Sequence, residues 1–358
     1  MTSAAGVSTR ERRARPAATR VETVDRFAHA LLGSTAMGGR LVLRATTQPG
    51  REAEAARDLD LAARRVRAWS SILTRHGADS ALLRLNADPR HGVPVGPTLA
   101  AALRWAADAA DMTGGVVDAT LLDARLAAEA GTTLGGSTTD ARDTGASGRH
   151  PLAVGPTSRA CWTLLPAGGR AAGSRTANGR GAVVDREPGL RFDLDGVAKG
   201  LIADRALALL GRHPGAIVDA DGDVAIRVAP GDRVTVGVGD PREPGTNLAV
   251  LAFEAPATAP SDVGVATSGI SIHRWDDGER ERHHLIDPRT SAPAATDVVQ
   301  ATAIAGSARV AEALAKSAVI LGSVDGLEFL ARAGAAGAVI LLRDGRVVAL
   351  PATTRFLT

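Results

Sequence analysis

The sequence contains a single cysteine, no tyrosine, and only two lysines among its 42 basic residues. Because Cys161 stands alone, an intrachain disulfide and a cysteine-based metal cluster are both excluded. Aromatic residues make up 3% of the chain, too few for the stacking surfaces that bind single-stranded nucleic acid. The formal net charge is only +3, so we expect no nucleic-acid partner.

The chain also lacks an apolar run long enough to cross a bilayer, so we expect no membrane insertion. Its first 20 residues are rich in arginine, and no apolar segment follows them as it would in a secretory signal. We therefore predict a disordered tail over residues 1–20 and a cytoplasmic protein. A hydrophobic content of 45% indicates a globular chain with a sizeable core.

The two lysines, Lys199 and Lys316, stand out in a chain that otherwise uses arginine for its positive charges. Lysine carries a compact ammonium on a flexible stem, whereas arginine carries a broad planar fork, and the two are not interchangeable at a tight site. A bias in composition could leave two lysines by chance. Their neighbours, described below, favour a functional role.

Apolar residues at helical spacing predict several helices, and short apolar runs between turn residues predict strands. The predicted helices span residues 52–69, 79–86, 97–112, 197–210 and 308–321, with Ser307 capping the last of them. The clearest predicted strands span residues 41–46, 191–194 and 298–305, and a hairpin is predicted to turn at Asp277-Gly278.

Helices and strands alternate without a strict βαβ rhythm, which indicates an α+β fold of mixed sheets packed with helices. Gly-, Ser- and Arg-rich segments near 131–158 and 167–182 lack apolar periodicity, so we expect flexible loops there. Predicted elements lie on both sides of these loops. We therefore expect one interleaved unit over residues 21–358.

The stretch DLDGVAKG places Asp193, Asp195 and Lys199 at a predicted strand-to-helix junction. Free backbone N–H groups at such a junction suit anionic ligands. Gly196 and Gly200 would let the backbone approach a ligand closely. The alternative is a helix capped by Asp195, with an ordinary surface lysine.

Three aspartates alternate in the glycine turn DADGD, at positions 219, 221 and 223. Carboxylates this close could hold a cation. They could equally form a hydrogen-bonded turn, because aspartate tolerates turn conformations, and we favour the turn.

The stretch HHLIDPRT contains His284 and Asp287, three residues apart. A histidine there could take a proton from an alcohol while an aspartate orients it, although both residues could be purely structural. Glu312 and Lys316 are four residues apart on a predicted helix. Their simplest interpretation is an intrahelical ion pair worth roughly 0.2–0.5 kcal/mol.

Taken together and in this order, the motifs resemble those of the ApbE family, the FAD:protein FMN transferases. The segments that carry the resemblance are Met37-Gly38, DSALLRLN (79–86), TGGVVDAT (113–120), DLDGVAKG (193–200), DADGDV (219–224), VATSG (265–269), HHLIDPRT (283–290) and SARVAEALAKSAVILG (307–322). They span most of the chain. The resemblance implies an ApbE-like fold for residues 21–358.

The resemblance also implies an activity: moving FMN from FAD to a Ser or Thr hydroxyl of an acceptor flavoprotein, with release of AMP. It implies that His284 and Asp287 act near the reacting pyrophosphate. It implies a Mg²⁺ ion held by the Gly196 carbonyl and by Glu312. The residues implied to contact FAD are Met37, Val116, Val117, Asp118, Asp193, Lys199 and Leu285.

One departure affects the implied metal site. Many family members have Asp and Thr as metal ligands where this chain has Glu312 and Lys316. An ammonium has no lone pair to donate to a cation. Lys316 could replace part of the metal charge and leave at most one Mg²⁺ on Glu312, or it could pair with Glu312 and leave no metal.

Two other activities remain open from the sequence: a non-catalytic FAD-binding protein, and an FAD pyrophosphatase that yields FMN and AMP. The sequence does not identify the acceptor. Residues 144–147, Thr-Gly-Ala-Ser, resemble the (Ser/Thr)-Gly-Ala-(Ser/Thr) core of the family's acceptor sites, which makes self-flavinylation of Ser147 a testable hypothesis.

Overall fold

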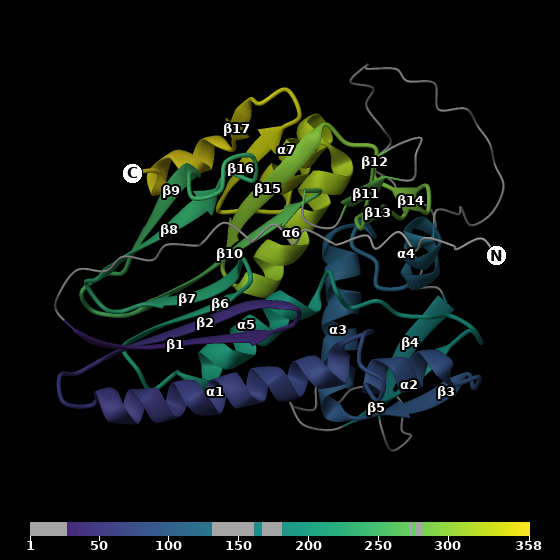
Figure 1. Cartoon of the computed structure of the whole chain (residues 1–358), viewed down its shortest axis with the longest axis horizontal. Coiled ribbons are helices and arrows are strands. Elements are labelled where there is room, and N and C mark those ends of the chain that lie inside the picture. Colours follow the sequence, from purple (N-terminus) through teal and green to yellow (C-terminus); the bar gives the residue numbers. More distant parts are fainter. Residues whose placement is uncertain (1–26, 131–160, 167–180, 272–273, 277–280) are drawn as a thin grey trace, which may run out of the picture.

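An eight-stranded antiparallel sheet forms the centre of the computed structural model, which describes residues 27–130, 161–166, 181–271, 274–276 and 281–358 (Figure 1). The strand order is β1-β2-β6-β7-β10-β15-β16-β17. In chain order the strands are β1 (Ala28–Ala36), β2 (Gly39–Thr47), β6 (Gly215–Ala220), β7 (Asp223–Val228), β10 (Ser261–Gly269), β15 (Val298–Ala305), β16 (Gly337–Leu342) and β17 (Val347–Ala349).

The two faces of this sheet are covered by different elements. One face packs against three helices, α1 (Glu52–Leu73), α5 (Ala198–Leu209) and α6 (Ala308–Leu321). The other face packs against a hairpin of β8 (Arg233–Gly239) and β9 (Asn247–Glu254). Side chains alternate accordingly along β7: Ala225 belongs to the helix-side core, whereas Val224 and Ile226 belong to the hairpin-side core.

The remaining helices lie beside or beyond this three-layer body (Figure 1). They are α2 (Ala81–Ala87), α3 (Pro97–Met112), α4 (Leu122–Glu129), α7 (Ser323–Arg332) and the 3-10 helix η2 (Pro351–Phe356). Small sheets complete the described part of the chain: β3 (Gly92–Val95) with β5 (Ala182–Arg186) and β4 (Trp162–Pro166), β11 (Arg274–Asp276) with β12 (Glu281–His283), and β13 (Ile286–Asp287) with β14 (Ala292–Pro293).

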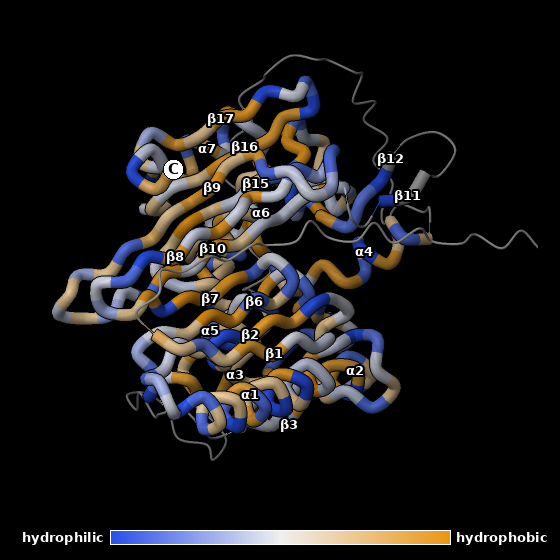
Figure 2. Tube along the Cα trace, turned by 60° about the vertical axis from the view of Figure 1, so that its left-hand side comes forward, coloured by the Kyte–Doolittle hydropathy of each residue, from blue (hydrophilic) through white to orange (hydrophobic). Residues whose placement is uncertain are grey.

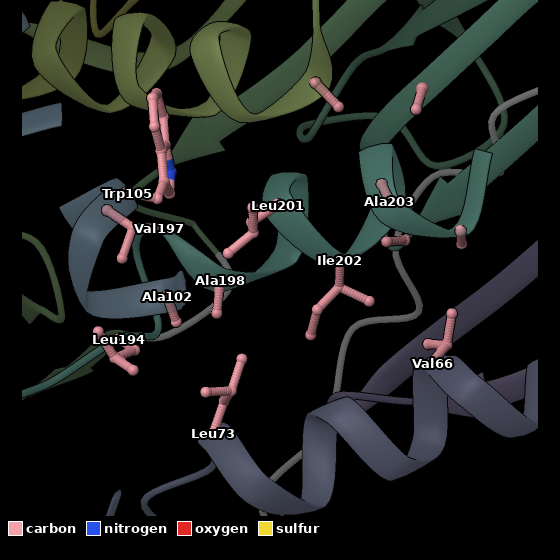
Figure 3. Close-up of a cluster of buried hydrophobic side chains, with 14 of the residues drawn as sticks. Val66, Leu73, Ala102, Trp105, Leu194, Val197, Ala198, Leu201, Ile202 and Ala203 are labelled. Atoms are coloured by element: carbon pink, nitrogen blue, oxygen red, sulfur yellow. The ribbon is translucent and has the colours of Figure 1, made fainter. Parts of the chain in front are cut away.

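Apolar residues from α1, α3 and α5 form the core beneath the predicted site. Figure 2 shows hydrophobic residues concentrated along the central strands. Figure 3 shows Leu201 and Ile202 of α5 among Leu73 of α1, Trp105 of α3 and other buried side chains. Complete burial of an aliphatic side chain of this size contributes about 1.5–3 kcal/mol. This core therefore fixes α5, which begins one residue before Lys199.

Helix α5 meets the start of α6 at very short range. A methyl group at Gly200 would lie 2.7 Å from the Ala308 carbonyl oxygen and 2.7 Å from the Arg309 nitrogen. The Asp204 carboxylate accepts hydrogen bonds from the Ala308 N–H at 2.8 Å and the Arg309 N–H at 3.2 Å. Asp204 therefore supplies the cap that we predicted for Ser307, whose own side chain makes no capping bond.

Several predicted elements are confirmed to the residue: the helices 97–112 and 308–321 and the strand 298–305. The α+β class is confirmed as well. Predictions for the tail 1–20, for Asp277-Gly278, for Ser147 and for nearly all of the two loop segments concern residues outside the described ranges. Within those ranges, no helix combines the length and the apolar character needed to cross a membrane.

The predicted strand 191–194 is wrong. Phe192 and Leu194 are fully buried, but this segment pairs with no neighbouring strand in the described part of the chain. The Asn86 side chain bonds the Phe192 backbone instead, donating to its carbonyl and accepting from its N–H, both at 2.8 Å. A buried backbone group needs a partner, and a side-chain amide can take the place of a strand.

Replacing Asp204 by alanine should remove the cap on α6 and lower the free energy of unfolding by about 1–2 kcal/mol. Asp204→Asn, which keeps one acceptor oxygen, should lose less. Urea unfolding of both variants measures the difference. Asp60→Ala removes an exposed, ion-paired carboxylate from α1 and serves as the control, with an expected loss below about 0.5 kcal/mol. Equal losses in Asp204→Ala and Asp60→Ala would contradict the capping role.

Candidate functional site

A cleft lies where α4, α6, the end of β10 and the start of α5 converge, and it encloses about 920 Å³ counting its open mouth. The lining residues come from distant parts of the sequence: Asp118, Leu121, Arg125, Asp193, Asp195, Gly196, Lys199, Asp221, Asp223, Thr267, Ser268, Gly269, His284, Leu285, Ile286, Glu312 and Lys316.

The junction before α5 forms one wall of the cleft. The Asp193 N–H donates to the Ala119 carbonyl at 2.7 Å, which ties the junction to the loop after α3. The Asp195 N–H donates to the Asp193 carboxylate at 3.0 Å. The predicted cap at Asp195 is wrong: Val197 is the N-cap residue of α5 and makes no side-chain capping bond. Asp195 is held by arginines instead.

The loop after α3 brings Asp118 to the cleft. Gly114 and Gly115 turn the chain with φ angles of 61° and 86°, which favour glycine. The Thr113 hydroxyl then accepts from the Val117 N–H at 3.0 Å. Asp118 lines the cleft and accepts two hydrogen bonds from Thr120, each at 2.8 Å.

Arg125 of α4 is a lining residue that the sequence analysis missed. Its guanidinium lies 2.8 Å from an Asp193 oxygen, 3.0 Å from an Asp195 oxygen and 3.1 Å from Glu129. Arg75 binds Asp195 from another side at 3.3 Å. The pair of aspartates in DLDG indicated that cations should lie nearby, but no motif indicated which arginines would supply them.

Lys199 lies 3.4 Å from an oxygen of the buried Asp223. This carboxylate raises the pKa of Lys199 above its usual value, so the ammonium stays charged at neutral pH. Burial raises the pKa of Asp223 to about 6, because lost hydration outweighs the attraction of Lys199. The cleft thus holds a positive charge beside a carboxylate whose pKa is raised by burial.

The aspartates of the β6–β7 turn form the hydrogen-bonded turn that we favoured. Asp219 accepts from the Gly222 N–H at 2.9 Å, and Asp221, with φ at 61°, accepts from the Arg40 N–H at 3.2 Å. Asp219 also pairs with the Arg40 guanidinium at 3.1 Å. These partners leave Asp221 and Asp223 on the cleft wall in fixed positions.

Glu312 and Lys316 project from one face of α6 into the cleft. Glu312 is 3% exposed, and one of its oxygens accepts from the Gly200 N–H at 3.0 Å. Its other oxygen, Oε1, is buried and has no hydrogen-bond partner in the described part of the chain. Burial, and then the charge of Asp223, raise the pKa of Glu312 well above its usual value.

The predicted intrahelical ion pair between Glu312 and Lys316 is wrong: one Glu312 oxygen binds the Gly200 N–H, and the other has no hydrogen-bond partner in the described part of the chain. The Lys316 ammonium lies against Gly196 instead, so closely that a methyl group at Gly196 would overlap it. Burial lowers the pKa of Lys316, and the charge of Asp193 opposes this shift. Lys316 has no ion-pair partner among the described residues.

The segment before β13 completes the cleft with His284 and Leu285. Asp287 does not line it. This carboxylate is 5% exposed and accepts four hydrogen bonds from Arg289. They come from Nη2 at 2.6 Å, from Nε at 2.8 and 3.0 Å, and from the backbone N–H at 2.9 Å. Asp287 is therefore placed to fix the loop that carries His284.

Four of the residues predicted to bind FAD line the cleft: Asp118, Asp193, Lys199 and Leu285. The others, Met37, Val116 and Val117, are not among its lining residues. Val116 and Val117 are buried in two different cores, and Met37 packs against the core of α1, α3 and α5.

The residues around Gly196 do not fit the expected Mg²⁺ site. Magnesium prefers near-octahedral oxygen ligands. The described residues contain no cluster of three or more His, Cys, Asp or Glu side chains that could hold a metal ion. The space at Gly196 faces an ammonium, which has no lone pair to give. Glu312 Oε1 is the one carboxylate oxygen near it that is buried and without a partner in the described ranges.

Comparison with known proteins identifies relatives of this chain. It is 30% identical over 173 residues to a curated protein of Treponema pallidum (strain Nichols) called FAD:protein FMN transferase, and the match covers 45% of this chain and 46% of that protein. The chain therefore spans about half the length of that relative.

Solved structures share the fold. A crystal structure of the ApbE protein from Thermotoga maritima matches with a TM-score of 0.68 and 21% identity, covering 92% of this chain and all of that one. The flavin transferase ApbE from Vibrio cholerae matches with a TM-score of 0.62 and 19% identity over the same share of each chain. The family model described as ApbE matches residues 37–340, most of the sequence, and the chain belongs to the ApbE family.

Proposed function

We propose that the protein transfers FMN from FAD to a Ser or Thr hydroxyl of an acceptor protein and releases AMP. The observation that carries the proposal is the convergence of Lys199, His284 and Glu312 in one cleft. Membership of the ApbE family and the name of the Treponema pallidum relative support the same activity. Splitting a pyrophosphate requires positive charge at its oxygens and a positioned nucleophile. Lys199 offers the positive charge, and a hydroxyl of the acceptor protein is the nucleophile that we propose.

The cleft supplies complementary groups for the parts of FAD. Leu121, Leu285 and Ile286 offer an apolar surface for a planar ring system. Asp118 and Asp193 offer carboxylate oxygens to the hydroxyl groups of the nucleotide. Met37, Val116 and Val117 do not line the cleft, and we propose that they affect FAD binding only through the packing of the cores to which they belong.

We assign to Lys199 the binding of the FAD phosphates. The acceptor's hydroxyl oxygen attacks the phosphorus of the FMN half, and a new phosphorus–oxygen bond forms. The bond to the bridging oxygen breaks, and its electron pair leaves with AMP. Lys199 stabilises the negative charge on the phosphate oxygens as this bond breaks.

We assign to His284 the role of the base that accepts the proton of the acceptor's hydroxyl. An imidazole in the cleft wall can accept the proton as the oxygen attacks, a step that typically contributes 10²–10⁴-fold to a rate. Asp287 acts by positioning the loop that carries His284, because its own carboxylate is fully engaged with Arg289.

The cytoplasmic location remains a prediction from the sequence.

Replacing Lys199 by methionine should weaken FAD binding about 10–100-fold, the equivalent of one charge-assisted hydrogen bond. Fluorescence titration with FAD measures the affinity. Lys199→Arg should recover only part of it, because the guanidinium fork does not fit the place of an ammonium. Full recovery with arginine, or an unchanged affinity in the methionine variant, would contradict the assignment.

A double variant separates binding from folding. Removing Lys199 leaves the buried Asp223 without its cation and should lower the melting temperature. Lys199→Met combined with Asp223→Asn should restore the melting temperature but not the affinity for FAD. Recovery of both properties would assign Lys199 a structural role alone.

Replacing His284 by glutamine should leave FAD affinity within about twofold and slow the transfer about 10²–10⁴-fold. The assay measures AMP release and the mass of an acceptor domain that carries a Thr-Gly-Ala-Ser core. His91→Gln, at an exposed position outside the cleft, is the matched control and should leave both quantities unchanged.

The same assay on the unmodified protein distinguishes the alternative activities. AMP with a flavin-labelled acceptor supports the transferase. AMP with free FMN would identify a pyrophosphatase. Tight FAD binding without AMP would identify a non-catalytic flavin-binding protein.

A further inference from the structure

We propose that the Lys316 ammonium takes the place of a divalent cation in this cleft, so that the protein binds FAD and cleaves its pyrophosphate without a metal ion. The cleavage part of this inference rests on the proposed function. The binding part does not rest on the proposed function, because it concerns only which anion the Lys316 ammonium binds in the cleft.

The first argument is the position of Lys316. Its ammonium lies directly over Gly196, whose missing side chain provides the space. Both residues line the cleft. A cation bound at the Gly196 backbone would have to displace Lys316 and would then meet an adjacent positive charge.

The second argument is that the nearby carboxylates are already neutralised. Asp193 and Asp195 line the cleft together with Gly196, and both are bound by Arg125 at 2.8 and 3.0 Å. Asp195 has a second partner in Arg75 at 3.3 Å. A metal ion would have to compete with two guanidinium groups that arrive from α4 and from the end of α1.

The other lining carboxylates have partners of their own. Lys199 binds Asp223, the Arg40 backbone binds Asp221, and Thr120 binds Asp118. Among the described residues, the charged lining group left without an ion-pair or hydrogen-bond partner is therefore a cation, Lys316. An ammonium without a partner can bind an anion. The pyrophosphate of FAD is such an anion, because its oxygens accept charge-assisted hydrogen bonds.

Glu312 Oε1 is the remaining argument for a metal ion, because it is buried without a partner in the described ranges. One carboxylate oxygen cannot supply an octahedral magnesium site. Glu312 also has a structural role, because its second oxygen accepts a hydrogen bond from the Gly200 N–H and so joins α6 to α5. Lys316 lies one helical turn away on the same face, within reach of Oε1 once a ligand draws the ammonium into the cleft.

The test compares the chelator-treated protein with the same protein in millimolar Mg²⁺. FAD affinity, from fluorescence quenching, and the flavin transfer rate should both change by less than about twofold. Manganese(II), read by electron paramagnetic resonance with FAD present, is the probe for a metal site. The unmodified protein should leave the Mn²⁺ signal undiminished.

Lys316→Thr should reverse these results. The variant should bind one Mn²⁺ per chain in the presence of FAD. Its FAD affinity should fall about 10–100-fold in chelator and recover with Mg²⁺, since a lost charge-assisted contact is then replaced by the metal. Arg104→Thr, which removes an exposed positive charge from α3, is the matched control and should behave as the unmodified protein.

Loss of FAD binding in chelator-treated unmodified protein, with recovery in Mg²⁺, would overturn the inference. Stoichiometric Mn²⁺ binding by the unmodified protein would overturn it as well, and Glu312→Gln would then abolish that binding. Metal-independent FAD binding without any flavin transfer would leave the binding part of the inference standing, and would refute the proposed function together with the cleavage part that rests on it. The measurements on the unmodified protein decide the matter even if Lys316→Thr fails to fold.

Discussion

The close approach of α5 and α6 at Gly200 determines the geometry of the cleft. A side chain at Gly200 would collide with the backbone of Ala308 and Arg309, so only glycine lets the two helices meet. The contact is reinforced by Asp204, which caps α6, and by Glu312, which binds the Gly200 N–H. One lysine comes from each helix. Their presence in one cleft therefore follows from a single missing methyl group.

The cleft concentrates charge in a place where charge is costly. Six carboxylates line it, and unpaired buried carboxylates would destabilise the fold by several kcal/mol. The arginines of α4 and of the segment after α1 offset this cost without entering the ligand volume as free cations. The same ion pairs fix the carboxylates in position, so the groups that stabilise the fold also keep the cleft ordered for its ligand.

Helices were predicted well where the periodic pattern of apolar residues within one segment was sufficient to define them. Residues 97–112 and 308–321 were bounded by Pro, Gly and Ser, and their helices were predicted to the residue. The convergence of Lys199, His284 and Glu312 required the order of several motifs together. The partners of each charge were not predictable. Arg125 lies 68 residues from Asp193 in sequence, and only the packing of α4 against the junction brings them together.

The two lysines of this chain line the same cleft, whereas many of the described arginines form ion pairs elsewhere in the fold. An arginine at position 316 would bring a planar fork into the space above Gly196, which the lysine ammonium already fills. Gly196 and Lys316 therefore depend on each other: the glycine provides room for one compact cation, and the lysine is the side chain that fits. Composition and geometry point to the same requirement, a positive charge small enough to lie against the backbone and mobile enough to follow a phosphate.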